Sequence, residues 1–188
     1  MKLPHLVQLT PEMKRAQIEY ELPLITQNYR IACILGIVFM PFGGFLDYFI
    51  YPEFMEFFFW LRVECSVLLT MIWWVLGQPF GKKYFRPLGL IEVTLPIFFI
   101  SWMVYETNGI HSDYYAGINL VLVGVGFLMR WGLADTTRMV VISVLLYLAA
   151  CLLGQKPLDG ESENKDLVNS IYFITLTGIF SMTGNYLY

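Results

Sequence analysis

Six long apolar segments alternate with short polar connections along this chain of 188 residues. A helix needs about 20 mostly apolar residues to cross a hydrocarbon core of roughly 30 Å. The fourth and fifth segments are shorter than the others, so we expect their helices to extend into the flanking residues. The pattern predicts an all-α integral membrane bundle of six transmembrane helices within residues 30–188. The apolar segments are Ile31–Ile50, Phe57–Gly77, Leu88–Tyr105, Ala116–Trp131, Met139–Leu153 and Val168–Leu187.

Residues 1–29 form a more polar segment before the first apolar run. Thr10 followed by Pro11 predicts a helix start, because a hydroxyl can cap the helix and proline suits its first position. Acidic, basic and apolar residues alternate irregularly in this segment. This mixture fits a helix on the membrane surface, and it fits equally well a cytoplasmic segment that precedes the first span. Pro23 is expected to kink or end this helix before the first span.

The charged residues predict an orientation for the bundle. Most of the twelve lysines and arginines lie in the N-terminal segment or in the connections after the second and fourth runs. The connections near Glu53, Asn108 and Gly160 are mainly acidic. Because positively charged connections stay in the cytoplasm, both termini are predicted to be cytoplasmic. The basic connection residues are Lys82, Lys83, Arg86, Arg130 and Arg138.

Composition supports membrane insertion and excludes several functions. Hydrophobic residues make up 57% of the chain and charged residues 14%, whereas soluble domains carry about 25% charged residues. The net charge of −3 gives no basic signal for nucleic acid. Cys33, Cys65 and Cys151 lie inside apolar runs, without the spacing of a disulfide framework or a zinc site. We therefore expect no metal or other cofactor, and no catalytic motif is visible in these residues.

Ionisable residues inside the apolar runs are the main candidates for function, because each costs roughly 2.5–3.5 kcal/mol on insertion scales. Asp47 and Arg62 flank a short connection and should lie at similar depth, so we expect them to form a pair. The pair can fix the first hairpin or form the floor of an outward-facing pocket. Glu64 faces another side of its helix, and Glu92 lies nearer the inner end of the third helix. Asn119 is a further polar candidate.

Aromatic residues near the outer ends of the helices suggest a ligand site. They could form the mouth of a pocket for a lipophilic or cationic small molecule. The alternative is a solvated acidic surface without a ligand. The aromatic residues are Tyr48, Trp60, Tyr105, Tyr114 and Tyr115.

Small residues in two helices predict close helix packing, because they let membrane helices approach one another. Glycines of the fourth helix indicate tight packing in the bundle or a dimer seam. Small and hydroxyl residues of the sixth helix indicate a buried helix or a homodimer interface, and we expect a parallel homodimer. The residues are Gly117, Gly124 and Gly126 in the fourth helix, and Thr175, Thr177, Gly178, Ser181, Thr183 and Gly184 in the sixth.

Two stretches resemble a six-helix membrane domain of bacterial signalling proteins. The first contains an Asn-x-Arg at Asn28, an Asp before a Tyr-Pro-Glu turn at Tyr51, and a Leu-Arg at Leu61. The second is a Tyr-Tyr-Ala-Gly-x-Asn-Leu segment beginning at Tyr114, although Arg130 stands where that family often has proline. Such domains precede class III adenylate or guanylate cyclases and sensor histidine kinases, including a quorum-sensing type.

The resemblance implies a sensory input domain in a bacterial inner membrane. A cytoplasmic cyclase or kinase module is then expected after Tyr188. Two other functions stay open from the residues alone. One is an accessory structural subunit of a larger membrane complex, and the other is a small transporter or channel.

Overall fold

The computed structural model describes residues 11–107, 109–154 and 161–186, and this part of the chain is helical, without strands. The all-α prediction is therefore confirmed. Short helices lie in the connections: α2 (Gly44–Ile50), η1 (Pro52–Phe54), α4 (Pro79–Lys83) and η2 (Gly109–His111). The long helices are α1 (Pro11–Phe42), α3 (Met55–Leu76), α5 (Phe85–Glu106), α6 (Tyr115–Leu128), α7 (Leu133–Leu153) and α8 (Glu161–Tyr186).

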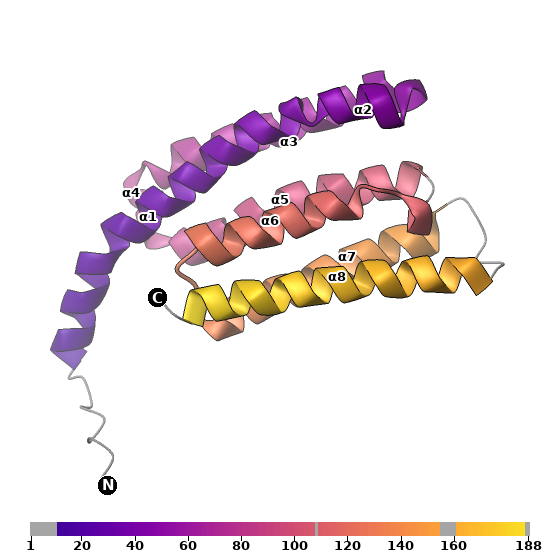
Figure 1. The fold of residues 1–188 in the computed structure, drawn as a ribbon. Coiled ribbons are helices and arrows are strands. Elements are labelled where there is room, and N and C mark those ends of the chain that lie inside the picture. Colours follow the sequence, from indigo (N-terminus) through magenta and orange to yellow (C-terminus); the bar gives the residue numbers. More distant parts are fainter. Residues whose placement is uncertain (1–10, 108, 155–160, 187–188) are drawn as a thin grey trace, which may run out of the picture.

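The long helices are stacked as three pairs, α1 with α3, α5 with α6, and α7 with α8 (Figure 1). Each long helix runs antiparallel to the next one along the chain. The most extensive packing in the last four helices joins α6 to α8 and α5 to α7, rather than neighbours in sequence. The start of α1 and the end of α8 lie at the same end of the bundle.

Helix α1 is longer than the first apolar run. It begins at Pro11, as predicted, and passes Pro23 without ending. Its first turns bend away from the bundle (Figure 1). The predicted cap at Thr10 lies outside the described residues. The helix breaks only at Gly43, after Pro41, and α2 then continues to the end of the bundle.

Helix α6 corrects one expectation about the fourth apolar run. It ends at Leu128 instead of extending past Trp131, and its 14 residues span about 21 Å. The backbone is extended at Met129 and Gly132, and the indole of Trp131 turns inward, where it donates a hydrogen bond to Tyr29. Helix α7, in contrast, does extend beyond its predicted start. Five described helices are long and apolar enough to cross a membrane, and α6 is a shorter apolar helix.

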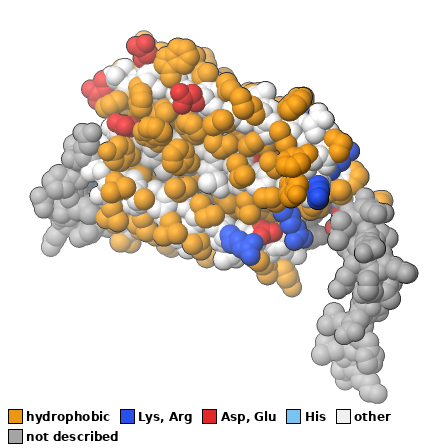
Figure 2. Space-filling view, turned by 180° about the vertical axis from the view of Figure 1, so that it is seen from behind, with side chains coloured by type: hydrophobic (Ala, Val, Ile, Leu, Met, Phe, Trp, Pro, Cys, Tyr) orange, Lys and Arg blue, Asp and Glu red, His pale blue; other side chains and the backbone are white. Residues whose placement is uncertain are grey.

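The surface matches a lipid environment. Large apolar side chains such as Phe39, Phe49, Met71 and Trp74 are more than half exposed. Figure 2 shows hydrophobic side chains across the middle of one face, with most of the visible carboxylates at one end and the lysines and arginines towards the other. So much exposed apolar surface identifies a membrane protein.

The two ends of the bundle are named here by their exposed charges. The acidic end contains η1 and η2, and its exposed residues include Glu53, Glu56, Asp113 and Asp166. The basic end contains α4 and the connection between α6 and α7, and its exposed residues include Lys82, Lys83, Arg86, Arg130 and Arg138.

Candidate functional site

A cluster of Asp47, Arg62 and Tyr114 lies near the acidic end. Nε of Arg62 donates to Oδ2 of Asp47, and Nη2 donates to Oδ1, both at 2.7 Å. The hydroxyl of Tyr114 donates to Oδ1 of Asp47, also at 2.7 Å. The expected pairing of Asp47 with Arg62 is therefore confirmed. The cluster joins the first hairpin to the residue that precedes α6.

The cluster is closed to solvent and electrically balanced. Asp47 is 0% exposed and Arg62 is 6% exposed. The remaining guanidinium nitrogen, Nη1, donates to the carbonyl oxygen of Met40 at 3.2 Å. A Cβ at Gly43 would overlap this guanidinium, so glycine is needed there for the arginine to reach the backbone. A buried ion pair with its hydrogen bonds satisfied in this way is tolerated in low dielectric.

Aromatic rings enclose the cluster, but they are not all the expected ones. Tyr114 packs edge-on against Phe58 with ring centroids 5.5 Å apart, and Tyr51 lies 5.4 Å away on another side. Tyr48 and Trp60 are 59% and 57% exposed, so they lie on the outer surface instead of lining a shared mouth. The adjacent tyrosines at 114 and 115 gave no signal for which one faces inward. Tyr114 contacts the ion pair, and Tyr115 is half-buried.

The other predicted polar residues lie apart from this cluster. Glu64 is exposed on α3, within the apolar surface. Glu92 is buried in α5 beside the Cys33 thiol, and apart from this thiol neither of its carboxylate oxygens has a hydrogen-bond partner among the described residues. Asn119 of α6 has a buried Oδ1 that likewise lacks a partner in the described chain. No hydrogen bond between described residues joins any of the three to Asp47 or Arg62.

The small residues of α8 face neighbouring helices of the same chain. A Cβ at Gly184 would lie 2.8 Å from the carbonyl oxygen of Gly126, and one at Gly178 would lie 2.6 Å from Val140. The hydroxyl of Ser181 donates to the carbonyl oxygen of Leu122 on α6. This packing accounts for the small residues on one face of α8, but the helix as a whole is not buried, because residues such as Tyr172, Ile179 and Phe180 are more than half exposed. Thr177 is half-buried on the same helix.

Polar contacts hold α8 at both ends of the bundle. At the acidic end, Nδ1 of His111 in η2 lies 2.7 Å from Oδ2 of Asp166. At the basic end, Nδ2 of Asn185 donates to Oγ1 of Thr136 at 3.1 Å. Helix α8 therefore connects the turn η2 at the acidic end with the start of α7 at the basic end.

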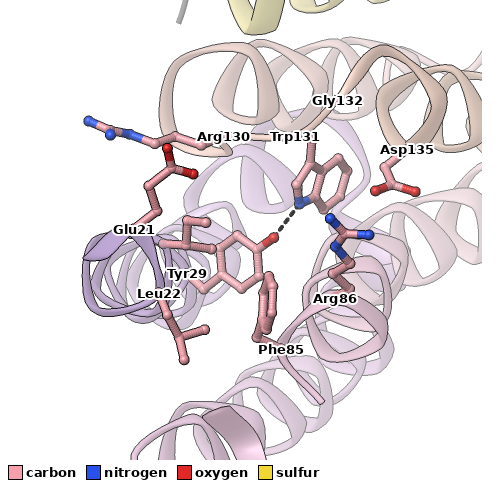
Figure 3. Close-up of a pocket in the computed structure, with 10 residues that line it drawn as sticks. Glu21, Leu22, Tyr29, Phe85, Arg86, Arg130, Trp131, Gly132 and Asp135 are labelled. Carbon is pink, nitrogen blue, oxygen red and sulfur yellow. Dashed lines mark hydrogen bonds between the residues drawn. The ribbon is translucent and has the colours of Figure 1, made fainter. Parts of the chain in front are cut away.

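A pocket of about 130 Å³ opens at the basic end, where the sequence predicted none (Figure 3). Its walls come from α1, α5, the extended segment 130–132 and the start of α7. The ring of Tyr29 packs against Gly89, where a Cβ would lie 2.5 Å away, and its hydroxyl accepts the hydrogen bond from Trp131. None of the aromatic residues predicted to form an outer mouth lines this pocket. The lining residues are Glu21, Leu22, Ile25, Tyr29, Phe85, Arg86, Arg130, Trp131, Gly132 and Asp135.

Comparison with known protein families gives a match over most of the chain. The family model MASE8 matches residues 45–188, which include most of α2 and every described helix after α2. No curated protein and no solved structure matches the chain significantly. MASE domains are membrane-associated sensory domains. A membrane bundle matched over most of its length by this model is a member of that group, and the chain belongs to the MASE8 family.

Proposed function

We propose that this chain is the sensory input domain of a bacterial inner-membrane signalling protein, and that α8 passes the signal to a cytoplasmic cyclase or histidine kinase module after Tyr188. The family match supports the sensory role. The observation that carries the relay is the position of α8, which contacts η2 through Asp166 and α7 through Asn185. A ligand can act through this helix only if it binds two arrangements of the bundle with different affinity.

We further propose six membrane spans with both termini in the cytoplasm. The chain between Tyr114 and Trp131 runs from the Asp47 cluster at the acidic end to Tyr29 at the basic end. This segment therefore supports a sixth crossing, although helix α6 itself is short. The concentration of lysine and arginine at the basic end supports a cytoplasmic location for that end.

A parallel homodimer is part of the proposal. The inward face of α8 is occupied by α6 and α7, so a second copy would contact the outward face, where Phe180, Thr183 and Tyr186 are exposed. Single cysteines at 183 and 186 in a cysteine-free background should crosslink in native membranes, whereas a cysteine at the inward position 185 should not. Absence of crosslinks at both outward positions would contradict the dimer and favour the alternative that the chain is an accessory subunit.

The relay itself is tested by changing the helical register after Tyr186. The chain is fused through Tyr188 to a class III cyclase catalytic domain, and cyclic AMP is measured in cells. Inserting one residue rotates the output by about 100°, and inserting seven residues restores the phase after two turns. We expect output to change with one residue and to recover with seven. Cyclic AMP production that is unchanged by both insertions would contradict a relay through α8.

A further inference from the structure

We propose that the pocket at the basic end binds a phosphoryl group, in the form of the head group of an anionic membrane phospholipid. The pocket lies where the apolar surface of the bundle meets its basic connections. Anionic head groups occupy this level of a membrane, and basic pockets between helices bind them. This binding does not depend on the proposed relay through α8.

The size of the pocket restricts what it can hold. The pocket has a volume of about 130 Å³. Sites for drug-sized molecules are about 300–1,000 Å³. The pocket therefore accommodates one head group, while the acyl chains lie outside along the apolar surface. Tyr20 and Leu24 provide exposed apolar side chains on α1 beside the pocket-lining residues Glu21 and Leu22.

The hydrogen-bonding groups of the pocket favour an anion. The guanidinium of Arg86 is exposed and forms no hydrogen bond with the described residues, so its donors are available to a ligand. The Tyr29 hydroxyl accepts from Trp131 and can still donate its own proton. Figure 3 shows Arg86 beside Trp131 and the Tyr29 hydroxyl. Arginine is well suited to phosphate because its planar fork donates two parallel hydrogen bonds.

The acidic residues of the lining do not cancel this preference. Oδ1 of Asp135 accepts a hydrogen bond from Nη1 of Arg138 at 2.8 Å, so its charge is compensated. Glu21 and Arg130 are both engaged in interactions of their own. Arg86 is therefore the cation that would bind the phosphoryl oxygens.

The test measures lipid retention by the whole chain in phosphatidylcholine nanodiscs that contain a minor fraction of phosphatidylglycerol. Native mass spectrometry reports which lipid stays bound to the protein after the protein is released from the nanodisc. Arg86→Gln removes the anchor, and Lys82→Gln is the matched control, because it removes one exposed charge at the same end without touching the pocket. We expect the wild type and the control to retain phosphatidylglycerol, and Arg86→Gln to lose roughly tenfold or more in affinity.

Four further results decide the proposal. Equal loss in both variants would mean a general attraction to the basic end and would overturn the pocket site, as would a wild type with no preference for phosphatidylglycerol. Thermal unfolding of Arg86→Gln should match the wild type, which shows that lost binding is not lost folding. Inorganic phosphate is added to pure phosphatidylcholine nanodiscs in a separate arm. Saturable binding of phosphate there would overturn the lipid as the source of the phosphoryl group.

Discussion

Two buried charges show how this chain satisfies ionised groups at membrane depth. Within the described chain, the hydrogen bonds to the carboxylate of Asp47 come from Arg62 and Tyr114, which belong to two different parts of the bundle. The pairing of Asp47 and Arg62 was predictable, because opposite charges on either side of a short connection must lie at similar depth. The third member was not, because one residue of helical rotation decides whether Tyr114 or Tyr115 faces inward.

The ion pair yields a stability prediction. Asp47→Ala and Arg62→Ala should each lower the free energy of unfolding by about 3–5 kcal/mol, because each leaves its partner charged and buried. The double variant should cost less than the sum of the two. Tyr114→Phe should cost less than either, about 1–3 kcal/mol, since it removes one hydrogen bond and keeps the ring. Denaturant unfolding in mixed micelles gives all four values, and strict additivity would contradict the observed contact.

Replacing Glu92, unlike replacing Asp47 or Arg62, should not destabilise the bundle. Its two carboxylate oxygens are buried with only the weakly hydrogen-bonding Cys33 thiol nearby, so the desolvation cost of the side chain is poorly compensated. Glu92→Leu has a similar shape and should leave the melting temperature unchanged or raise it. Thermal unfolding in nanodiscs provides the measurement. A clear fall in melting temperature would show that Glu92 has a stabilising partner that this arrangement lacks.

At the scale of helices, the packing of α6 on α8 depends on residues without large side chains. The glycines of α6 were expected to serve tight packing or a dimer seam, and the structure shows Gly126 against Ser181 and Gly184 of the same chain. Apolar run length predicted the helices well. It failed at the end of α6, because the side chain of Trp131 turns inward to a partner that is distant in sequence, and periodicity contains no information about such a contact.

The glycines of α6 provide a matched pair of substitutions. A Cβ at Gly126 would lie 2.8 Å from the Cα of Ser181, whereas a Cβ at Gly124 meets nothing within 4 Å. Gly126→Ala should therefore separate the two helices and destabilise the bundle by about 1–3 kcal/mol. Gly124→Ala gains the same helix propensity without the overlap and should be neutral or stabilising. Thermal unfolding of both variants is the measurement, and equal values would mean that α6 and α8 are not packed in this way.

At the scale of the whole molecule, the charges separate into an acidic and a basic end, and hydrophobic side chains cover the surface between them (Figure 2). This separation was predictable, because the sign of the charge on each connection can be read directly from the sequence. The pocket was not predictable. Its walls come from four segments that are far apart in sequence, and none of them carries a local motif.

The orientation is tested by labelling single cysteines in intact cells with an impermeant maleimide. In a cysteine-free background, a cysteine at the exposed position 53 should react, and one at the exposed position 82 should react only after the cells are permeabilised. Asn108 and Gly160, which are expected on the same side as Glu53, lie outside the described residues. Reaction at 82 together with protection at 53 would reverse the orientation.

The packing of α6 on α8 and of α5 on α7 also determines the order in which the bundle can be completed. A chain made from its N-terminus can close the α1–α3 hairpin early, because these helices pack mainly on each other. Helix α6 then enters the membrane with Gly126 still uncovered, since its main partner is synthesised last. Assembly therefore finishes only when α8 arrives. A chain that stalls before α8 therefore keeps α6 packed on α5 but leaves the glycine face of α6 exposed to the bilayer.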